Sequence, residues 1–288
     1  MRLLKFTFQS SRNLLRTYRL EGLSGVRRKI SRLLWRCRFS CMRSLARILP
    51  LSHVTVRGGV RMFPNFEDHT FYLEFTGDNE YLRKMLLRVS KRFCLIDVGA
   101  NQGYYSLIAA KNPSCLQIFA LEPVTGTRKL LAKNVVLNRL SDRIDVLSFG
   151  ISSRYQAANM QVPKHHSGAA TLRESLVKFA YILEPVELKP LRVLEQMVPK
   201  ECAVFIKIDV EGYEETVIQS FVESGLSNRT EWIFLEVDER WINLGNIVKE
   251  LNSVGNWDFV RIGDGLHYDI LAVKTDNSLS ENDRSVVV

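Results

Sequence analysis

The first fifty residues have almost no acidic side chains. They hold 13 of the chain's 40 Lys and Arg residues and a single acid, Glu21. The formal net charge of +9 therefore belongs to this segment, and the remaining residues are close to neutral. Domains that bind nucleic acid usually carry a basic patch on the binding surface. We therefore expect no nucleic-acid partner for the body of the chain.

Long hydrophobic runs are also absent. No stretch approaches the roughly 20 apolar residues that a membrane-spanning helix needs. Arg12, Arg16 and Arg19 interrupt the apolar core that a secretory signal peptide requires. These absences predict a cytoplasmic protein. An Arg-rich, acid-poor N-terminus is also typical of organelle-targeting segments, so targeting by the arm stays open as an alternative.

Cysteine is scarce, and its spacing does not predict a metal site. Cys37 and Cys41 are four residues apart, but no His or second Cys pair completes a zinc site. Cys94, Cys115 and Cys202 lie in or beside apolar runs. We expect these three to be buried free thiols, which suits the reducing cytosol.

Pro50 separates a basic arm from the rest of the chain. We predict a basic helical arm over residues 1–50, a catalytic domain over 51–275 and a polar tail over 276–288. Apolar residues of the arm recur at helical spacings, with Arg and Lys between them. This pattern favours a helical hairpin docked on the domain. Peripheral membrane contact through residues 1–49, as an amphipathic helix on anionic lipid, is the second interpretation, and an acidic partner or a targeting role is the third.

Residues 51–275 predict an α/β fold. Alternation between residues 54 and 75 predicts two or three short strands, including 71–75, and residues 79–90 predict an amphipathic helix. From Phe93 onward, near-continuous apolar strands alternate with helices, which is typical of a mostly parallel sheet covered on both faces. The predicted strands are 93–98, 116–122, 144–151, 203–210 and 231–237. The predicted helices are 103–111, 125–140, 213–224 and 240–254. An antiparallel pair of strands is predicted at 257–262 and 268–274. Residues 152–189 are interpreted as a substrate loop.

The loop after the first of these strands has the spacing of a cofactor loop. Gly99 and Gly103 form a G-x-x-x-G pattern between a strand and a helix, where a tight turn and a close ligand approach need glycine. The G-x-G-x-x-G spacing of nicotinamide-binding folds is not present, which disfavours an oxidoreductase. Asp97 would repel a pyrophosphate but could bind an amino group. Glu122, at the end of the next strand, could accept both hydroxyls of a ribose.

A third motif follows the strand at 203–210. Lys207 and Asp209 alternate onto one face of that strand, so they can pair or share a site. Glu211 adds a further carboxylate at the predicted crevice. Glu214 opens a helix, where an acid is favoured by the helix dipole alone.

Three sequence blocks, LIDVGANQGYYSL, ALEPVTGTRKLLAKNVVLN and FIKIDVEGYEETVI, resemble the FkbM family of methyltransferases. The resemblance implies a Rossmann-like class I fold, S-adenosylmethionine (SAM) as cofactor, and O-methylation of a sugar, a glycan or a polyketide-type small molecule. It places Asp209, Glu211 and His166 at the methyl-transfer crevice. The implied cofactor-binding residues are Asp97, Gly99, Asn101, Gly103, Tyr104, Glu122, Pro123 and Gly150. The chain departs from the family pattern at Leu191-Arg192 and around Gln219-Ser220, away from the cofactor loop.

A hydroxyl acceptor benefits from a general base, for which Asp209 is the first candidate and His166 or His165 the second. Asp209, Glu211 and Glu236 could also cluster around a metal ion, but we expect none. Methylation of a protein or nucleic acid is the alternative enzymatic function. The alternative from another class is a non-catalytic SAM-binding scaffold held at a membrane by the arm.

Overall fold

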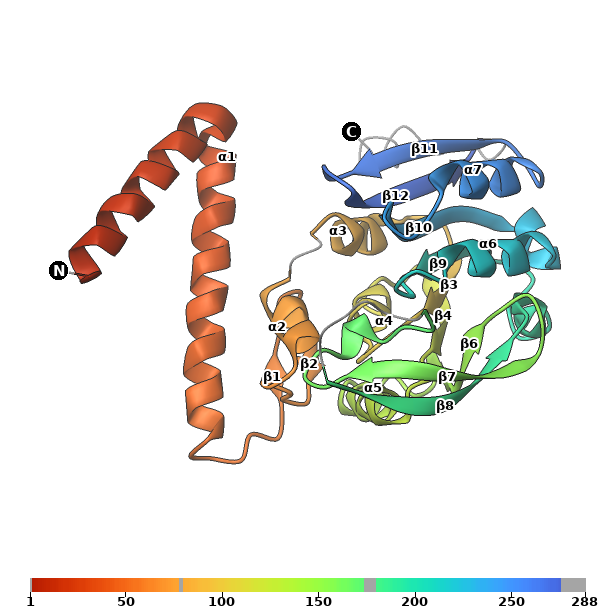
Figure 1. The fold of residues 1–288 in the computed structure, drawn as a ribbon, viewed down its shortest axis with the longest axis horizontal. Coiled ribbons are helices and arrows are strands. Elements are labelled where there is room, and N and C mark those ends of the chain that lie inside the picture. Colours follow the sequence, from red (N-terminus) through yellow and green to blue (C-terminus); the bar gives the residue numbers. More distant parts are fainter. Residues whose placement is uncertain (1, 78–79, 174–179, 276–288) are drawn as a thin grey trace.

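A seven-stranded sheet forms the centre of the molecule (Figure 1). The computed structural model describes the backbone of residues 2–77, 80–173 and 180–275, and the side chains of these residues except 2–22 and 24. The strand order is β11-β12-β10-β9-β3-β4-β5, and neighbouring strands are parallel except where β12 pairs with β10 and β11. The strands are β3 (Phe93–Val98), β4 (Cys115–Leu121), β5 (Ile144–Leu147), β9 (Ala203–Ile208), β10 (Thr230–Asp238), β11 (Trp257–Ile262) and β12 (His267–Lys274). The predicted α/β fold, a seven-stranded, mostly parallel sheet with an antiparallel C-terminal hairpin, is confirmed.

Helices cover both faces of this sheet, as the apolar strands predict. On β3, Leu95 packs into one buried cluster with α3, α4 and α5, whereas Ile96 packs into a second cluster with α6 and α7. Successive strand residues point to opposite faces, so one strand contributes to both clusters. The helices are α3 (Glu80–Arg88), α4 (Tyr104–Ala109), α5 (Thr125–Leu137), α6 (Glu214–Val222) and α7 (Leu244–Asn252).

The single strand predicted at 144–151 is wrong, because the chain leaves the main sheet at the exposed Ser148. The residues after it form β6 (Phe149–Ile151), which joins a separate sheet of order β6-β8-β7. Its other strands, β7 (Gln156–Pro163) and β8 (Tyr181–Lys189), come from the segment interpreted as a substrate loop. A short 3-10 helix, η1 (Ser167–Ala169), lies between them, and two more are η2 (Leu191–Leu194) and η3 (Gly225–Asn228).

Residues 71–75, predicted as a strand, are also a correction, since they belong to helix α2 (His69–Thr76). The side chain of Asp68 accepts a hydrogen bond from the Phe71 amide and so caps the helix start. Gly77 ends the helix at a φ of 70°. Phe71 and Phe75 are one turn apart and both fully buried. The short hairpin predicted before α2 is present as β1 (Val54–Thr55) and β2 (Arg61–Met62).

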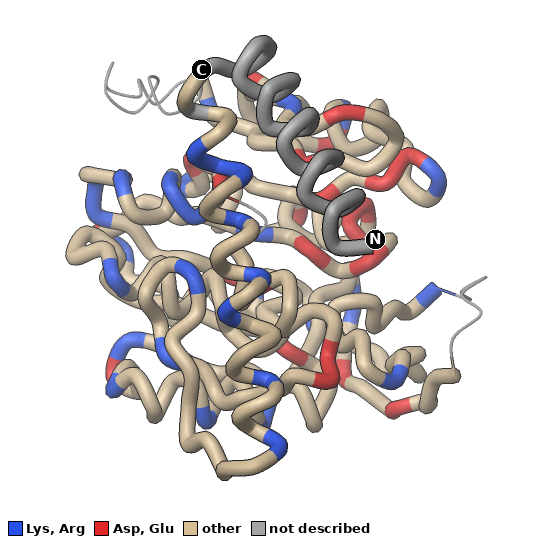
Figure 2. The backbone as a smooth tube through the Cα atoms, turned by 90° about the vertical axis from the view of Figure 1, so that its left-hand side faces the viewer, with Lys and Arg blue, Asp and Glu red and all other residues tan. Residues whose placement is uncertain are grey.

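The N-terminal arm is one helix, α1 (Arg2–Ala46), and not the predicted hairpin. Figure 1 shows the helix bent near its middle, with its C-terminal part beside α2. Phe39 inserts into the core of the domain, and its ring meets those of Tyr72 and Phe75 edge-on, with centroids 5.0 and 5.2 Å apart. Arg43 forms a bidentate ion pair with Glu67. Figure 2 shows Lys and Arg along the described part of this helix.

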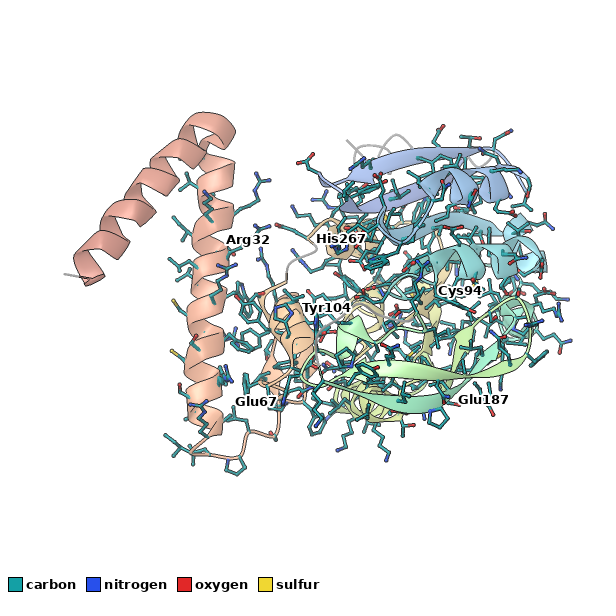
Figure 3. The ribbon with its side chains drawn as sticks, viewed as in Figure 1. Arg32, Glu67, Cys94, Tyr104, Glu187 and His267 are labelled. Atoms are coloured by element: carbon teal, nitrogen blue, oxygen red, sulfur yellow. A yellow bond between two sulfur atoms is a disulfide. The ribbon has the colours of Figure 1, made fainter. Side chains whose placement is uncertain are left out.

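Two cysteines expected to be free thiols form a disulfide, Cys94–Cys202. Cys94 is on β3 (Figure 3) and Cys202 directly precedes β9, and these strands are neighbours in the sheet. Because they are 108 residues apart in sequence, no local pattern indicates the pairing. Cys115 is a buried free thiol, as predicted, and Cys37 and Cys41 are free and exposed.

We predict that Phe39→Ala lowers the free energy of unfolding by about 3 kcal/mol, because it leaves a cavity between α1 and the domain. Leu34, on the exposed side of the same helix, is the control. Leu34→Ala should change the free energy by less than about 0.5 kcal/mol. Urea denaturation of both variants measures the difference. Equal effects would contradict a docked α1.

Candidate active site

A pocket of about 280 Å³ opens at the carboxyl ends of β3, β4, β9 and β10. This is the edge at which open parallel sheets bind ligands. Helix α2 and η1 close the pocket from one side, and the β6-β8-β7 sheet contributes a further wall. The charged residues that line it are Glu74, Glu122, Lys207, Asp209, Glu211, Glu236 and Asp269.

The loop from Asp97 to Gly103 forms one end of the pocket. Gly99 has a φ of 78°, and a Cβ at that position would lie 1.9 Å from the carbonyl oxygen of Asp209. Only glycine therefore fits where this loop packs against the end of β9. Gly103 turns the chain into α4 at a φ of 91° and does not line the pocket. Asn101 lines it with a φ of 50°, which is uncommon outside glycine.

Glu122 joins this loop to the end of β4. One carboxylate oxygen accepts a hydrogen bond from the Asn101 amide, and the other accepts one from the Val124 amide, both at 2.9 Å. Burial raises the pKa of Glu122 to about 7, although these two hydrogen bonds lower it. An ionised carboxylate can accept about four hydrogen bonds. Two positions thus remain for hydroxyl groups of a ligand.

Asp97 is fully buried beneath the pocket and does not line it. It accepts a hydrogen bond from the Ser106 hydroxyl at 2.7 Å, and its other oxygen lies 3.3 Å from Lys207 Nζ. The geometry thus places Asp97 behind the cofactor loop, where it holds Lys207. The predicted contact of Asp97 with an amino group of a cofactor stays a prediction.

Lys207 connects the two loops that meet at the sheet edge. Its Nζ atom donates to the Gly99 carbonyl at 3.1 Å and lies 3.3 Å from carboxylate oxygens of both Asp97 and Asp209. Burial would lower the pKa of Lys207, but the two carboxylates raise it above its usual value. The side chain therefore stays charged. The predicted pairing of Lys207 with Asp209 is confirmed.

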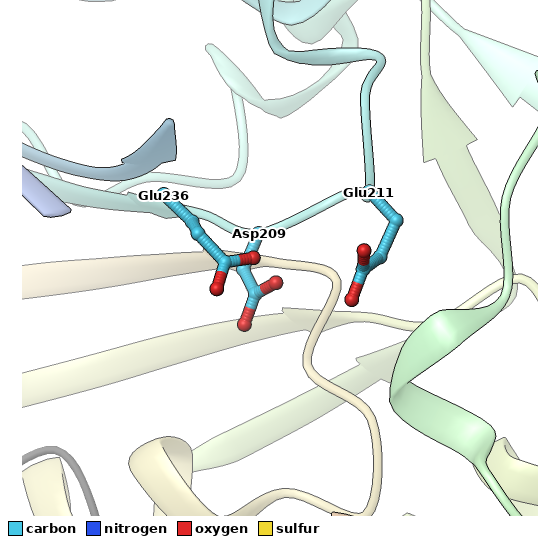
Figure 4. Close-up of side chains that lie close together, drawn as sticks. All are labelled: Asp209, Glu211 and Glu236. Atoms are coloured by element: carbon cyan, nitrogen blue, oxygen red, sulfur yellow. The ribbon is translucent and has the colours of Figure 1, made fainter. Parts of the chain in front are cut away.

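Three carboxylates gather where β9 and β10 meet the pocket (Figure 4). Asp209, Glu211 and Glu236 each offer an oxygen atom, and these atoms lie within 4.8 Å of one another. Burial, then the charges of Asp209 and Glu236, raise the pKa of Glu211, although the residue is exposed to solvent, which screens these charges. Burial and Asp209 also raise the pKa of Glu236. Such a cluster can share protons or hold a divalent cation.

The loop that carries Glu211 is strained and braced. Glu211 has a φ of 52°, and Gly212 follows at 95°. Thr171 Oγ1 donates to the Glu211 carbonyl at 2.7 Å. Glu214 accepts hydrogen bonds from the amides of Val210 and Gly212, both at 3.2 Å. Glu214 therefore orders this loop at the start of α6.

Some of the remaining predicted site residues line the pocket, and others do not. Pro123 and Gly150 line the pocket, and so does Tyr104, whose hydroxyl donates to the Arg57 carbonyl at 2.9 Å. His166 does not line the pocket. It is half-buried and its Nε2 atom lies 3.4 Å from His69 Nδ1.

His165, the other histidine considered as a base, is exposed and adopts a φ of 63°. Its carbonyl accepts a hydrogen bond from the His69 amide at 2.8 Å. Burial lowers the pKa of His166, and the neighbouring His69 lowers it further. The two histidines thus brace the start of α2 beside the pocket.

Sequence reasoning missed the contribution of α2. Asp68 accepts hydrogen bonds from the Ser167 amide and hydroxyl at 2.8 and 3.0 Å, and Ser167 also donates to Asn101 Oδ1 at 3.0 Å. Glu74 brings another carboxylate into the pocket from α2. Burial, then Asp68, raise the pKa of Glu74 well above its usual value. Asp68 as a helix cap, with Gly77 nine residues later, was the signal that could have identified this helix.

Comparisons with solved structures return methyltransferases. The METTL16 methyltransferase domain matches with a TM-score of 0.47 and 14% identity, over 76% of this chain and 74% of that one. Human methyltransferase 10 domain containing protein matches with a TM-score of 0.45 and 16% identity, over 77% and 91%. The precorrin-6y C5,15-methyltransferase of Geobacter metallireducens gives 0.38 and 17%, over 67% and 88%. A search of curated proteins found no significant match.

The family model described as the Methyltransferase FkbM domain matches residues 97–260. The match begins at the cofactor loop and ends in β11, so it contains β4 with Glu122 and the loop with Asp209 and Glu211. It covers more than half of the chain. The protein therefore belongs to the FkbM methyltransferase family.

Proposed function

We propose that this methyltransferase uses SAM and transfers its methyl group to a hydroxyl of a small molecule or glycan. One observation carries the proposal. One pocket has the carboxylate of Glu122, which follows β4, at a first end, and the carboxylates of Asp209, which follows β9, and Glu236, near the end of β10, at a second end. These two strands lie two and three strands away from β4 in the sheet order. A donor with a ribose and an acceptor with a hydroxyl would then meet within one enclosed space.

The residues of the first end fit SAM. Glu122 would hold the two ribose hydroxyls, because each of its oxygens has a position left after binding a backbone amide. Pro123, Gly150 and Ile151 offer an apolar surface beside it for an adenine ring. All charged residues that line the pocket are acids except Lys207, and acids attract the positive sulfonium and ammonium groups of SAM.

The residues of the second end suit proton removal. SAM supplies an electrophilic methyl carbon when bound, and most of the acceleration comes from holding donor and acceptor aligned in a dry site. Lys207 fixes the carboxylate of Asp209, which would accept the proton of the acceptor hydroxyl. Glu236 can share that proton, since the two carboxylates are adjacent. Glu211, an exposed carboxylate beside Asp209, would accept a hydrogen bond from another hydroxyl of the acceptor.

The negative charge of the second end of the pocket favours an acceptor without phosphate groups. Asp209, Glu211, Glu236 and Asp269 line the pocket there, and Lys207 is already paired with two carboxylates. This surface repels phosphate groups, which argues against a nucleic-acid acceptor. A neutral polyhydroxy compound finds several hydrogen-bond acceptors for its hydroxyl groups there. These features support the small-molecule or glycan acceptor over the nucleic-acid alternative.

Calorimetric titration with S-adenosylhomocysteine tests the cofactor proposal. We expect the intact protein to bind with a Kd in the micromolar range. Glu122→Ala should weaken binding by at least about tenfold, because two charge-assisted hydrogen bonds to the ribose are lost. Glu201→Ala, at an exposed acid outside the pocket, should leave the affinity unchanged. A folded, cofactor-free sample that does not bind would refute the proposal.

The pH dependence of this binding gives a second prediction. Glu122 has a pKa of about 7, so it is mostly ionised at pH 8 and mostly protonated at pH 6. The ionised form accepts the ribose hydroxyls. The affinity for S-adenosylhomocysteine should therefore fall by about tenfold from pH 8 to pH 6. The Glu122→Gln variant should bind weakly with no such slope, and an equal slope in that variant would assign the titration to another group.

Asp209→Asn separates catalysis from cofactor binding. Once a screen of sugars and polyketides identifies an acceptor, the variant should reduce kcat by about 10²–10⁴-fold through loss of the base. Its affinity for S-adenosylhomocysteine should stay within about threefold, since Lys207 still pairs with Asp97. Glu201→Gln serves as the control. A rate equal to that of the intact protein would exclude Asp209 as the base.

A further inference from the structure

Helix α1 has two different faces. One face packs on the domain through Trp35, Phe39 and Met42. The opposite face carries exposed apolar side chains at spacings of three, four and seven residues, and we call it the outer stripe. The outer stripe consists of Leu23, Ile30, Leu34, Cys37, Cys41 and Leu45. Figure 3 shows side chains that project from α1 away from the domain.

Basic residues border the outer stripe along one side. At 3.6 residues per turn, Arg27 and Arg38 lie along that side, with the Arg38 guanidinium 4.7 Å from the centre of the Trp35 ring, whereas Arg36 lies toward the docked face. The sequence contains no acid between Glu21 and Glu67. In this part of α1 the charge is therefore of one sign, and Figure 2 shows its Lys and Arg residues along the described part of the helix.

We propose that the outer stripe binds the surface of an anionic lipid membrane, with α1 parallel to the membrane plane. A helix with an exposed apolar stripe and charges of one sign, all basic, inserts its apolar side chains at the headgroup boundary and places its bases near the lipid phosphates. No described helix is long and apolar enough to cross a membrane. The proposal concerns α1 alone and does not depend on the acceptor or cofactor.

The charge of α1 favours an anionic membrane over a second copy of the chain or a nucleic acid as the partner of the outer stripe. A second copy that packs stripe on stripe would bring the bases of one α1 close to those of the other, with no acid of α1 from residue 22 onward to neutralise them. A nucleic acid would neutralise the bases but would leave the row of Leu and Ile side chains in water. An anionic bilayer matches both features at once.

The docked face connects the membrane helix to the active site. Phe39 and Trp35 pack on α2, and the opposite side of α2 contributes Thr70, Leu73 and Glu74 to the pocket. A bilayer beneath the outer stripe would thus lie two helices away from the pocket. Binding would position the enzyme next to the membrane without covering the residues of the acceptor end.

Vesicle co-sedimentation of the full chain tests the proposal. The probes are phosphatidylcholine vesicles with and without about 30% phosphatidylserine. Arg27→Gln with Arg38→Gln should lower partitioning onto the anionic vesicles by about tenfold or more. Ile30→Gln with Leu34→Gln should lower it by a similar factor. Lys129→Gln with Lys249→Gln removes two exposed bases elsewhere and should have little effect.

A fluorescent probe reports whether the stripe enters the lipid. Cys37 and Cys41 are exposed free thiols, whereas Cys115 is buried and Cys94 is bonded to Cys202. A polarity-sensitive maleimide should therefore label the outer stripe selectively, and its emission should shift to shorter wavelength with anionic vesicles.

Three results would overturn the proposal. The first is that the intact chain does not sediment with anionic vesicles, and the second is that the Lys129→Gln and Lys249→Gln variant loses as much vesicle binding as the α1 variants. The third is a concentration-dependent dimer that forms without lipid and is abolished by Ile30→Gln with Leu34→Gln. Circular dichroism of each variant checks that the fold is unchanged.

Discussion

Lys207 is a buried cation placed between two carboxylates, and both ends of the pocket depend on it. Asp97 on β3 and Lys207 on β9 face each other across the parallel register, and Asp209 follows two residues later. Without the ammonium group, a fully buried Asp97 would remain unpaired next to another carboxylate. Breaking such a buried pair typically costs several kcal/mol. Because Nζ also donates to the Gly99 carbonyl, one side chain ties the cofactor loop to the end of β9 that carries Asp209.

This arrangement explains why the remaining acids are unusual. The charge of Lys207 is shared by Asp97 and Asp209, whereas Glu236 is paired with His267, whose Nε2 atom lies 2.6 Å from Glu236 Oε1. Glu211 lies beside Asp209 and is exposed. Burial and mutual repulsion then raise the pKa of both glutamates. A site with one carboxylate fixed by Lys207 and neighbouring carboxylates of raised pKa offers a base for a hydroxyl group.

The main sheet and the two charged loops follow from local sequence, because their strands are continuously apolar and their turns contain glycine. Glu122 could be placed from its position at a strand end alone. The wall of the pocket formed by α2 could not, because Phe71, Phe75 and the residues between them also fit a strand pattern. Neither the Cys94–Cys202 pairing nor the separation of β6 from β5 has a local signal, since both depend on which distant strand lies alongside. The burial of Asp97 behind the loop could not be predicted, because burial is a tertiary property.

Because α1 has one docked face and one exposed face, deleting the helix cannot test membrane binding separately from the packing of the domain. Phe39 belongs to the core, so removal of residues 1–49 would expose Phe71 and Phe75 as well as eliminate the outer stripe. Loss of membrane binding in such a truncation would not distinguish a missing lipid contact from a damaged α2. Asp68, which caps α2, also binds Ser167, and Ser167 binds Asn101 of the cofactor loop. Disturbance at the docked face therefore has a continuous hydrogen-bonded route to the cofactor end of the pocket, whereas the exposed outer stripe makes no contact on that route.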